Sequence, residues 1–118
     1  MMRTILKSKL HGATVTQAEL FYEGSITIDG DLMEHADIME HERVQVVNLS
    51  NGERLETYVI TGEAGSGIIC MNGPAARLCA VGDSIHILSY VVASDEECAD
   101  YKPKILLVGD GNRARKSL

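Results

Sequence analysis

Short apolar runs, either alternating with polar residues or continuous over five to nine positions, constrain the fold of this chain more than any other feature. A period of two places successive side chains on opposite faces of an extended backbone, which is typical of a β-strand. The predicted strands are Ser25–Asp29, Val44–Leu49, Arg54–Ile60, Gly67–Met71, Ser84–Val92 and Lys104–Val108. These runs predict a mainly β fold.

Turn and cap residues separate the predicted strands. Asn51-Gly52 predicts a two-residue hairpin turn within 44–60, because both central residues of such a turn need positive φ. Two short helices are predicted, one with Asp31 as its N-cap and one with Ser94 as its N-cap and Glu97 three residues later. Many short strands with two minor helices favour a closed β-barrel over a sheet of βαβ units.

The length of 118 residues predicts a single domain over 1–118. The chain is 45% hydrophobic and 24% charged, which is typical of ordinary globular proteins. Only 4% of the residues are aromatic and Trp is absent, so the core must consist of Val, Ile, Leu, Ala and Met. So few rings favour completion of the apolar surface by neighbouring subunits.

The formal net charge of −6 disfavours a nucleic-acid partner on electrostatic grounds. The basic residues Arg113, Arg115 and Lys116 follow a turn-like segment, and we expect 110–118 to be a mobile tail. The opening segment is interrupted by Arg3, Lys7 and Lys9, so it does not resemble a signal peptide, and no run is long enough to cross a membrane. We therefore expect a cytoplasmic, reducing location.

Several familiar ligand motifs are excluded by their spacing. Cys70, Cys79 and Cys98 lack a CxxC spacing, and the four histidines do not cluster with them, so neither a disulfide framework nor a metal site is expected. The glycine-rich segment 62–67 lacks the Lys-Ser/Thr pair of a phosphate-binding loop. The acidic residues around 29–40 lack the inner ligand and the glycine of a calcium loop.

The pair Gly24-Ser25 stands in an informative context. A Gly-Ser pair alone is typical of a turn, and Gly65-Ser66 is interpreted in that way. The segments around Gly24-Ser25 and further along the chain closely resemble the aspartate 1-decarboxylase family. They are Lys9-Leu10-His11, Ala13-Thr14-Val15-Thr16, Tyr22 to Asp29, Asn51-Gly52-Glu53-Arg54 with Thr57-Tyr58, Asn72-Gly73-Pro74-Ala75-Ala76, and Val81-Gly82-Asp83. The resemblance runs from about Arg3 to Val108.

This resemblance implies a double-psi β-barrel and a homotetramer. It also implies self-cleavage into a small chain, 1–24, and a large chain, 25–118, that begins with a pyruvoyl group made from Ser25. The implied reaction is decarboxylation of L-aspartate to β-alanine for pantothenate synthesis. Two positions depart from the family pattern: Gly12 replaces an arginine found in many members, and Pro74 replaces a commoner alanine and removes a backbone N–H.

Self-cleavage requires a hydroxyl that attacks the preceding carbonyl. Ser25 is the predicted nucleophile, and Gly24 leaves the attacked carbonyl unhindered. The attack forms an ester through an oxyanion, for which Thr57 is the donor implied by the resemblance, with Asn72 as a second polar group. Elimination of the ester and hydrolysis then leave a pyruvoyl group, with loss of ammonia.

The pyruvoyl ketone can form a Schiff base with an amino-acid substrate and accept the electrons of the departing carboxylate. Arg54 and Lys9 are suited to bind the side-chain carboxylate, and Tyr58 is the predicted proton donor. The resemblance adds two groups of residues. The substrate contacts are Thr57 and the loop of Gly73, Pro74 and Ala75, and the supporting residues are His11 and Tyr22.

Strand periodicity leaves the arrangement of these residues open. In a regular strand, Thr57 and Tyr58 point to opposite faces. If both reach the site, as the resemblance implies, the strand must bulge or end there, or the site must lie where chains meet. Two alternative functions also remain open. One is an uncut, non-catalytic barrel that binds a small anion, and the other is a pyruvoyl decarboxylase acting on another amino acid such as glutamate. Whether a helper protein accelerates maturation is open as well.

Overall fold

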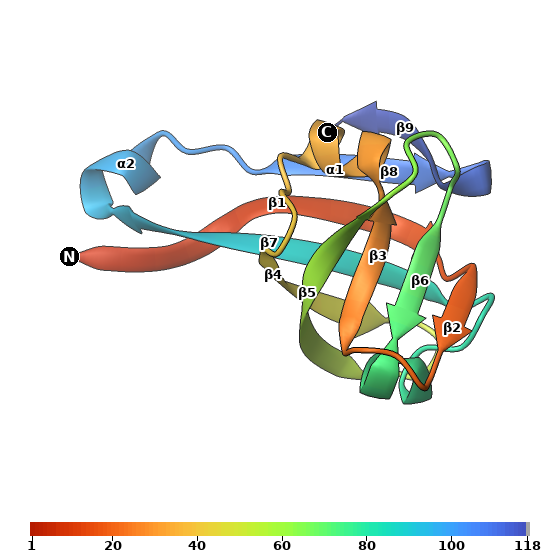
Figure 1. Ribbon diagram of the computed structural model, residues 1–118. Helices are drawn as coiled ribbons and strands as arrows, with labels where there is room; N and C mark the ends of the chain where they lie inside the picture. Colours follow the sequence, from red (N-terminus) through yellow and green to blue (C-terminus); the bar gives the residue numbers. More distant parts are fainter. Residues whose placement is uncertain (118) are drawn as a thin grey trace.

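The computed structural model describes residues 1–117, and within them nine strands make up one sheet. The strands are β1 (Met2–Thr14), β2 (Gln17–Glu19), β3 (Ser25–Asp29), β4 (Arg43–Asn48), β5 (Arg54–Gly62), β6 (Ile69–Asn72), β7 (Ser84–Ser94), β8 (Lys104–Gly109) and β9 (Arg113–Ser117). Their order across the sheet is β2-β6-β3-β5-β4-β7-β1-β8-β9 (Figure 1).

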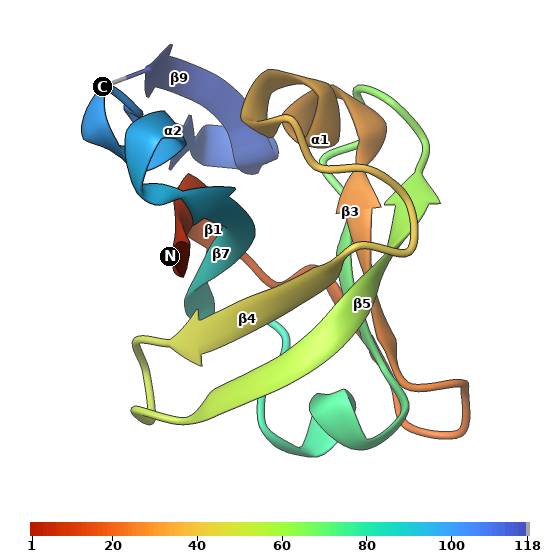
Figure 2. The same ribbon diagram turned by 90° about the vertical axis from the view of Figure 1, so that its left-hand side faces the viewer.

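The sheet curls until it closes on itself. Only Val15 and Thr16 separate β1 from β2, yet β2 lies at one edge of the sheet order and β1 lies near the other. A two-residue connection cannot span an open sheet of this width, so the two edges must approach each other. The Asn112 side chain, from the turn before β9, links the two sides, because its Nδ2 donates both to Thr14 O at the end of β1 and to Gly67 O just before β6. Figure 2 shows β5 between β3 and β4 on the curved wall.

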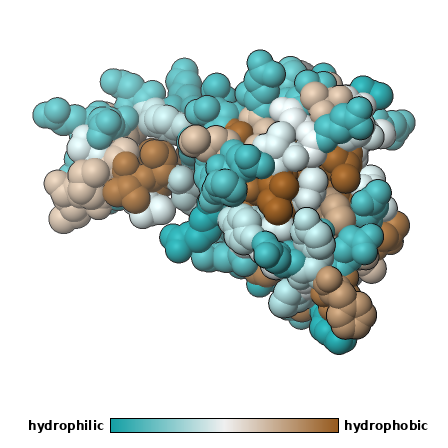
Figure 3. All heavy atoms as spheres, viewed as in Figure 1, coloured by the Kyte–Doolittle hydropathy of each residue, from teal (hydrophilic) through white to brown (hydrophobic). Residues whose placement is uncertain are grey.

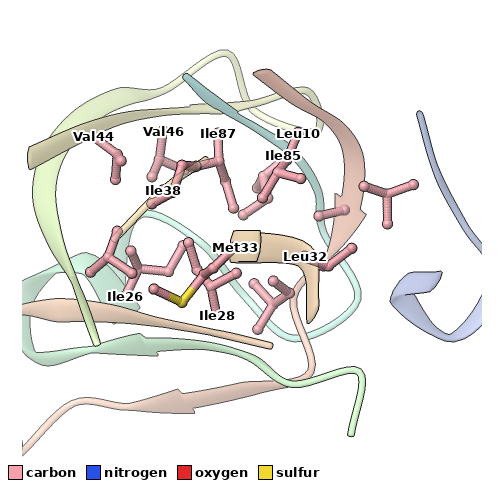
Figure 4. Close-up of a cluster of buried hydrophobic side chains, with 14 of the residues drawn as sticks. Leu10, Ile26, Ile28, Leu32, Met33, Ile38, Val44, Val46, Ile85 and Ile87 are labelled. Carbon is pink, nitrogen blue, oxygen red and sulfur yellow. The ribbon is translucent and has the colours of Figure 1, made fainter. Parts of the chain in front are cut away.

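The inward-facing side chains are aliphatic and come from every part of the barrel wall. Figure 4 shows Leu10, Ile26, Ile28, Val46, Ile85 and Ile87, all fully buried. Ile69 and Met71 are fully buried as well. Among the described residues no aromatic ring is buried, as the composition predicts. Each such side chain contributes about 1.5–3 kcal/mol on burial, so this cluster is the main source of stability. The prediction of a mainly β barrel with two short α-helices is confirmed.

The helices are α1 (Gly30–Ala36) and α2 (Asp95–Ala99), with 3-10 turns η1 (Gly73–Arg77) and η2 (Asp110–Asn112). The capping box of Ser94 and Glu97 is confirmed at α2. The predicted N-cap of α1 is wrong, because the cap is Asp29, whose carboxylate accepts from Asp31 N at 2.8 Å. The same carboxylate also accepts hydrogen bonds from Gly65 N and Gly67 N. Asp29, the last residue of β3, therefore holds the loop around residues 65–67 as well as the start of α1.

The β4–β5 hairpin is confirmed, but its predicted two-residue turn is wrong. Asn48 N donates to Glu53 O at 2.8 Å, so the loop contains the four residues 49–52. Gly52 has φ +77°, whereas Asn51 does not have positive φ. The Asn51 side chain instead accepts from Glu53 N at 2.8 Å, which stabilises the longer loop.

The segment predicted to be a mobile tail is paired in the structure. Residues 110–117 form η2 and β9, and β9 pairs with β8. Asn112 anchors the segment, because its Nδ2 donates to Thr14 O at 2.8 Å and Gly67 O at 2.7 Å, and its Oδ1 accepts from Thr14 N. Leu118 lies outside the described residues.

Strand β1 was not among the predicted strands, because its charged side chains interrupt the apolar pattern. Its first half pairs with the end of β7 in a two-stranded arm that extends from the barrel (Figure 1). The arm exposes Met1, Met2 and Val92, and apolar atoms gather at that end of the molecule in Figure 3. In the part of the chain described here, no helix has the length and apolar character that a membrane crossing requires.

Candidate active site

Ser25 is the first residue of β3 and is fully buried. The residues before it, Tyr22 to Gly24, are exposed, so the peptide bond between Gly24 and Ser25 joins a surface turn to a buried strand. The Ser25 side chain is held close to this turn, with its Oγ 3.4 Å from the carbonyl oxygen of Glu23. The hydroxyl that the sequence predicts as nucleophile is therefore next to the turn and shielded from bulk water.

Asn72 fixes the Ser25 hydroxyl from the neighbouring strand. The antiparallel pairing of β3 and β6 sets Ser25 opposite Asn72, and Asn72 is 3% exposed. Its Nδ2 donates to Ser25 Oγ at 2.9 Å and to Thr27 Oγ1 at 3.0 Å. Asn72, proposed from the sequence as a second polar group for the oxyanion, thus forms a direct hydrogen bond to the Ser25 hydroxyl.

Gly73 packs directly against the turn that contains the predicted cleavage site. It has φ +67°, and a Cβ at this position would lie 2.6 Å from Tyr22 O and 2.9 Å from Gly24 Cα. Only glycine allows this approach, because such a contact leaves no room for a side chain. Pro74 follows at the start of η1, where the first N–H groups of a helical turn have no partner within it.

A cavity of about 570 Å³ opens beside the turn and collects several predicted residues. Its lining includes Gly24, Thr57, Tyr58, Pro74 and Ala75. Both Thr57 and Tyr58 reach it although β5 pairs with β4 without a register shift, Thr57 opposite Val44 and Tyr58 opposite Arg43. Neither the bulge nor the strand end considered from the sequence is present.

The remaining lining residues were not predicted. Leu55 and Leu78 make the wall largely apolar, while Arg43 and Glu56 form an exposed ion pair with Nε and Oε2 3.7 Å apart. That Arg43 lines the cavity follows from the register of β4 against β5, which sets Arg43 opposite Tyr58 and cannot be derived from the sequence. The cavity therefore combines an apolar wall with a few polar groups close to Gly24.

Lys9, His11 and Arg54 do not line this cavity. Arg54 lies exposed at the start of β5 and donates from Nη1 to Gln45 Oε1 at 3.0 Å. Lys9 and His11 lie on β1 between β7 and β8. The structure of one chain thus separates the predicted cationic ligands from the cavity beside Gly24. Tyr22 does not line the cavity either, and its side chain is exposed.

His11 has a partner that sequence reasoning missed. Its ring stacks on His86 of β7, with ring centres 3.9 Å apart. Gly12, at a bulge in β1 with φ +84°, donates its N–H to His86 Nδ1 at 3.0 Å. Burial, followed by the nearby charges of His11 and Lys9, lowers the pKa of His86 to about 4. The glycine at position 12 accommodates the positive φ of this bulge, which a residue with a side chain rarely adopts, whereas the hydrogen bond uses only its backbone N–H.

Residues for a metal ion are not gathered in this site. Within 1–117, no group of three or more His, Cys, Asp or Glu side chains is arranged to hold a metal. The polar groups closest to the predicted nucleophile are a hydroxyl and an amide, which suit acyl chemistry on a peptide carbonyl rather than metal coordination.

Comparisons with known proteins agree with this arrangement. A family model described as aspartate decarboxylase matches residues 1–115. The aspartate 1-decarboxylase of Thermoanaerobacter pseudethanolicus is 58% identical over 113 residues, covering 96% of this chain and 97% of that protein. Its counterpart in Ralstonia nicotianae is 53% identical over 116 residues, covering 98% and 97%.

Among solved structures, the rationally designed mkDPBB_sym_86 protein aligns with 69% of this chain and 94% of its own, at 18% identity and a TM-score of 0.49. The family model and the curated relatives cover nearly the whole chain, cleavage turn and cavity included. This chain therefore belongs to the aspartate decarboxylase family.

Proposed function

We propose that this protein decarboxylates L-aspartate to β-alanine and CO2, after cutting itself between Gly24 and Ser25. The observation that carries the proposal is the buried Ser25 hydroxyl, held by Asn72 next to a turn whose Gly24 lines the cavity together with Thr57 and Tyr58. The full-length relatives bearing the name aspartate 1-decarboxylase support it. β-Alanine made in this way feeds pantothenate synthesis.

Maturation begins at Ser25. Its Oγ forms a bond to the Gly24 carbonyl carbon while the peptide C–N bond breaks, which yields an ester and a free amine on residue 25. Thr57, which lines the same cavity as Gly24, is the proposed donor that stabilises the oxyanion. Elimination then breaks the ester Cβ–O bond, releases the Gly24 carboxylate, and leaves a dehydroalanine. Addition of water and loss of ammonia complete the pyruvoyl group.

The surroundings of position 25 fit a pyruvoyl group. The position is fully buried, and Asn72 Nδ2 with Thr27 Oγ1 supplies polar contacts suited to carbonyl oxygens. When present, the group supplies a ketone that binds the amine of the substrate and accepts the electron pair of the broken carbon–carboxylate bond. This chain would then mature into the segments 1–24 and 25–118.

The cavity suits the loss of a carboxylate. Leu55, Pro74, Ala75 and Leu78 present an apolar surface to the substrate, and a carboxylate in apolar surroundings loses CO2 more readily than one that is hydrated. The Tyr58 phenol faces the same space and is the proposed proton donor to the substrate carbon. Gly73 shapes this space by its contact with the cleavage turn.

The side-chain carboxylate of aspartate requires a cation. Lys9 and Arg54 are the proposed ligands, and because they do not line the cavity of their own chain, we propose that a neighbouring chain completes each site. The apolar end of the β1–β7 arm supports association. This is the basis of the proposed homotetramer, which we expect to act in the cytoplasm.

The first test is intact-mass spectrometry of the purified chain under denaturing conditions, with and without a carbonyl reagent. We expect two fragments divided after Gly24, of which only the larger reacts with the reagent. Ser25→Ala should remain one chain and release no CO2. A wild-type chain that stays whole after long warm incubation would contradict autocatalysis. Cleavage that then appears on addition of a cell extract would indicate a maturation helper protein.

Substrate choice is tested by CO2 release from aspartate and from glutamate. Turnover of aspartate and not glutamate is the expected result. Turnover of glutamate alone would replace the substrate but keep the chemistry. An uncut chain that binds small anions and releases no CO2 from either amino acid would favour the non-catalytic barrel.

A further inference from the structure

A cysteine thiol lies one hydrogen bond away from the residue that holds Ser25. Cys70 is on β6, 4% exposed, with its Sγ 3.2 Å from Asn72 Oδ1. We propose that Cys70 is a positioning residue for maturation, which orients the Asn72 side-chain amide and thereby sets the rate of self-cleavage at Ser25. The inference rests on the proposed function and adds a residue to it.

The cross-strand register brings these groups into one row. Antiparallel pairing of β3 and β6 sets Ser25 opposite Asn72 and Thr27 opposite Cys70. The amide of Asn72 thus lies between two hydroxyls on one strand and a thiol on its own strand. An amide in such a place can adopt two orientations that differ by a half-turn about its last side-chain bond.

Only one orientation of the Asn72 amide forms the hydrogen bonds observed with Ser25, Thr27 and Cys70. The two hydrogens of Nδ2 go to Ser25 Oγ at 2.9 Å and Thr27 Oγ1 at 3.0 Å, while Oδ1 faces the thiol. Because Oδ1 carries no hydrogen, the thiol must be the donor. In the opposite orientation, Nδ2 would face the sulfur, which is a weak acceptor, and both hydroxyls would have to donate to Oδ1.

The orientation matters for the nucleophile. With Nδ2 as donor, Ser25 Oγ accepts, and its own hydrogen is directed to the carbonyl oxygen of Glu23, 3.4 Å away in the turn before Gly24. With Oδ1 facing it, the Ser25 hydroxyl would have to donate to the amide and would lose that contact with the turn. The thiol of Cys70 therefore favours the arrangement in which the Ser25 hydroxyl is held against the turn that it attacks.

The thiol keeps the proton that this role needs. Burial, with a smaller contribution from the negative charge of Glu19, raises the pKa of Cys70. A thiolate would accept hydrogen bonds and attract Nδ2, which would reverse the amide. The apolar surroundings of Cys70 thus hold it in the donating form.

The experiment measures the rate constant of self-cleavage in full-length chain made by cell-free synthesis, by mass spectrometry over a time course. Cys70→Val keeps the volume of the side chain and loses the donor, whereas Cys70→Ser keeps the donor and loses volume. We expect Cys70→Val to cleave roughly three- to tenfold more slowly than wild type, as the loss of one orienting hydrogen bond implies, and Cys70→Ser to stay within about twofold. A packing role would give the reverse order.

Cys79→Ala is the control, since Cys79 is also buried but its side-chain hydrogen bond goes to Asn48 and not to Asn72. It should unfold at lower temperature and cleave at the wild-type rate once folded. Cys70→Val cleaving as fast as Cys70→Ser overturns the role of Cys70 and leaves the proposed function intact. A wild-type chain that never cleaves refutes both.

Discussion

The contact between Gly73 and the cleavage turn allows a quantitative prediction for Gly73→Ala. The new Cβ would lie 2.6 Å from Tyr22 O and 2.9 Å from the N and Cα of Gly24, well inside contact distance. The turn, η1 or both must move by several tenths of an ångström. Such overpacking costs about 1–3 kcal/mol, and the positive φ of residue 73 adds about 1–2 kcal/mol for a residue with a side chain.

Gly52→Ala provides the matched control. Gly52 also has positive φ, +77°, but nothing lies within 4 Å of the position its Cβ would take. Its free energy of unfolding should fall only by the cost of the positive φ, about 1–2 kcal/mol, whereas that of Gly73→Ala should fall by roughly 2–5 kcal/mol. Urea denaturation of both variants, made in the uncut Ser25→Ala background, measures the difference.

The kinetic consequence is larger than the thermodynamic one. Moving Gly24 relative to Ser25 Oγ disturbs the line of attack, and a misplacement of about 1 Å can cost on the order of 100-fold in rate. We expect Gly73→Ala to cleave itself at least about tenfold more slowly than Gly52→Ala at a temperature where both are folded. Equal cleavage rates in the two variants would refute the view that Gly73 positions the turn.

Three further predictions concern stability and substrate binding. Asp29→Ala should lower the free energy of unfolding, measured by urea denaturation, by about 3–5 kcal/mol, because the buried carboxylate accepts hydrogen bonds from three backbone N–H groups. Asp31→Ala, at an exposed position, should change it by less than about 1 kcal/mol. His86, with its pKa lowered to about 4, is neutral in the folded protein while the unfolded chain protonates near pH 6.5. Stability should therefore fall by up to about 3 kcal/mol between pH 6.5 and pH 4, a loss that His86→Phe should remove, and an unchanged pH profile in this variant would contradict the assignment. Arg54→Ala should cleave normally but raise the KM for aspartate by about 100-fold or more, and an unchanged KM in the CO2 assay would count against its role.

Local sequence patterns determined much of the fold. The alternation in 25–29 and 44–60, the capping box at Ser94 and the glycine before Ser25 are each defined by neighbours a few residues apart. Their structure follows from backbone conformation and side-chain direction, which act over the same short range. The shortage of aromatic residues likewise determined an aliphatic core.

Local patterns failed where distant contacts decide the structure. The strand 2–14 is disguised by outward-facing charges and is defined by its partners β7 and β8. Asn51-Gly52 is typical of a two-residue turn, but the register of the flanking strands requires four residues. The segment 110–117 becomes ordered structure because Asn112 bonds to Thr14 and Gly67, both far away in the chain.

The candidate site shows the same division. The sequence by itself determined which residue types are available: Ser25 as nucleophile, Gly24 before it, and a nearby supply of hydroxyls, an amide and a phenol. Only the tertiary structure decided that Asn72 holds Ser25, that Cys70 orients Asn72, that His86 covers His11, and that Arg54 lies outside the cavity. Residue chemistry is local, whereas these contacts depend on the register between strands, which is set by packing of the whole barrel.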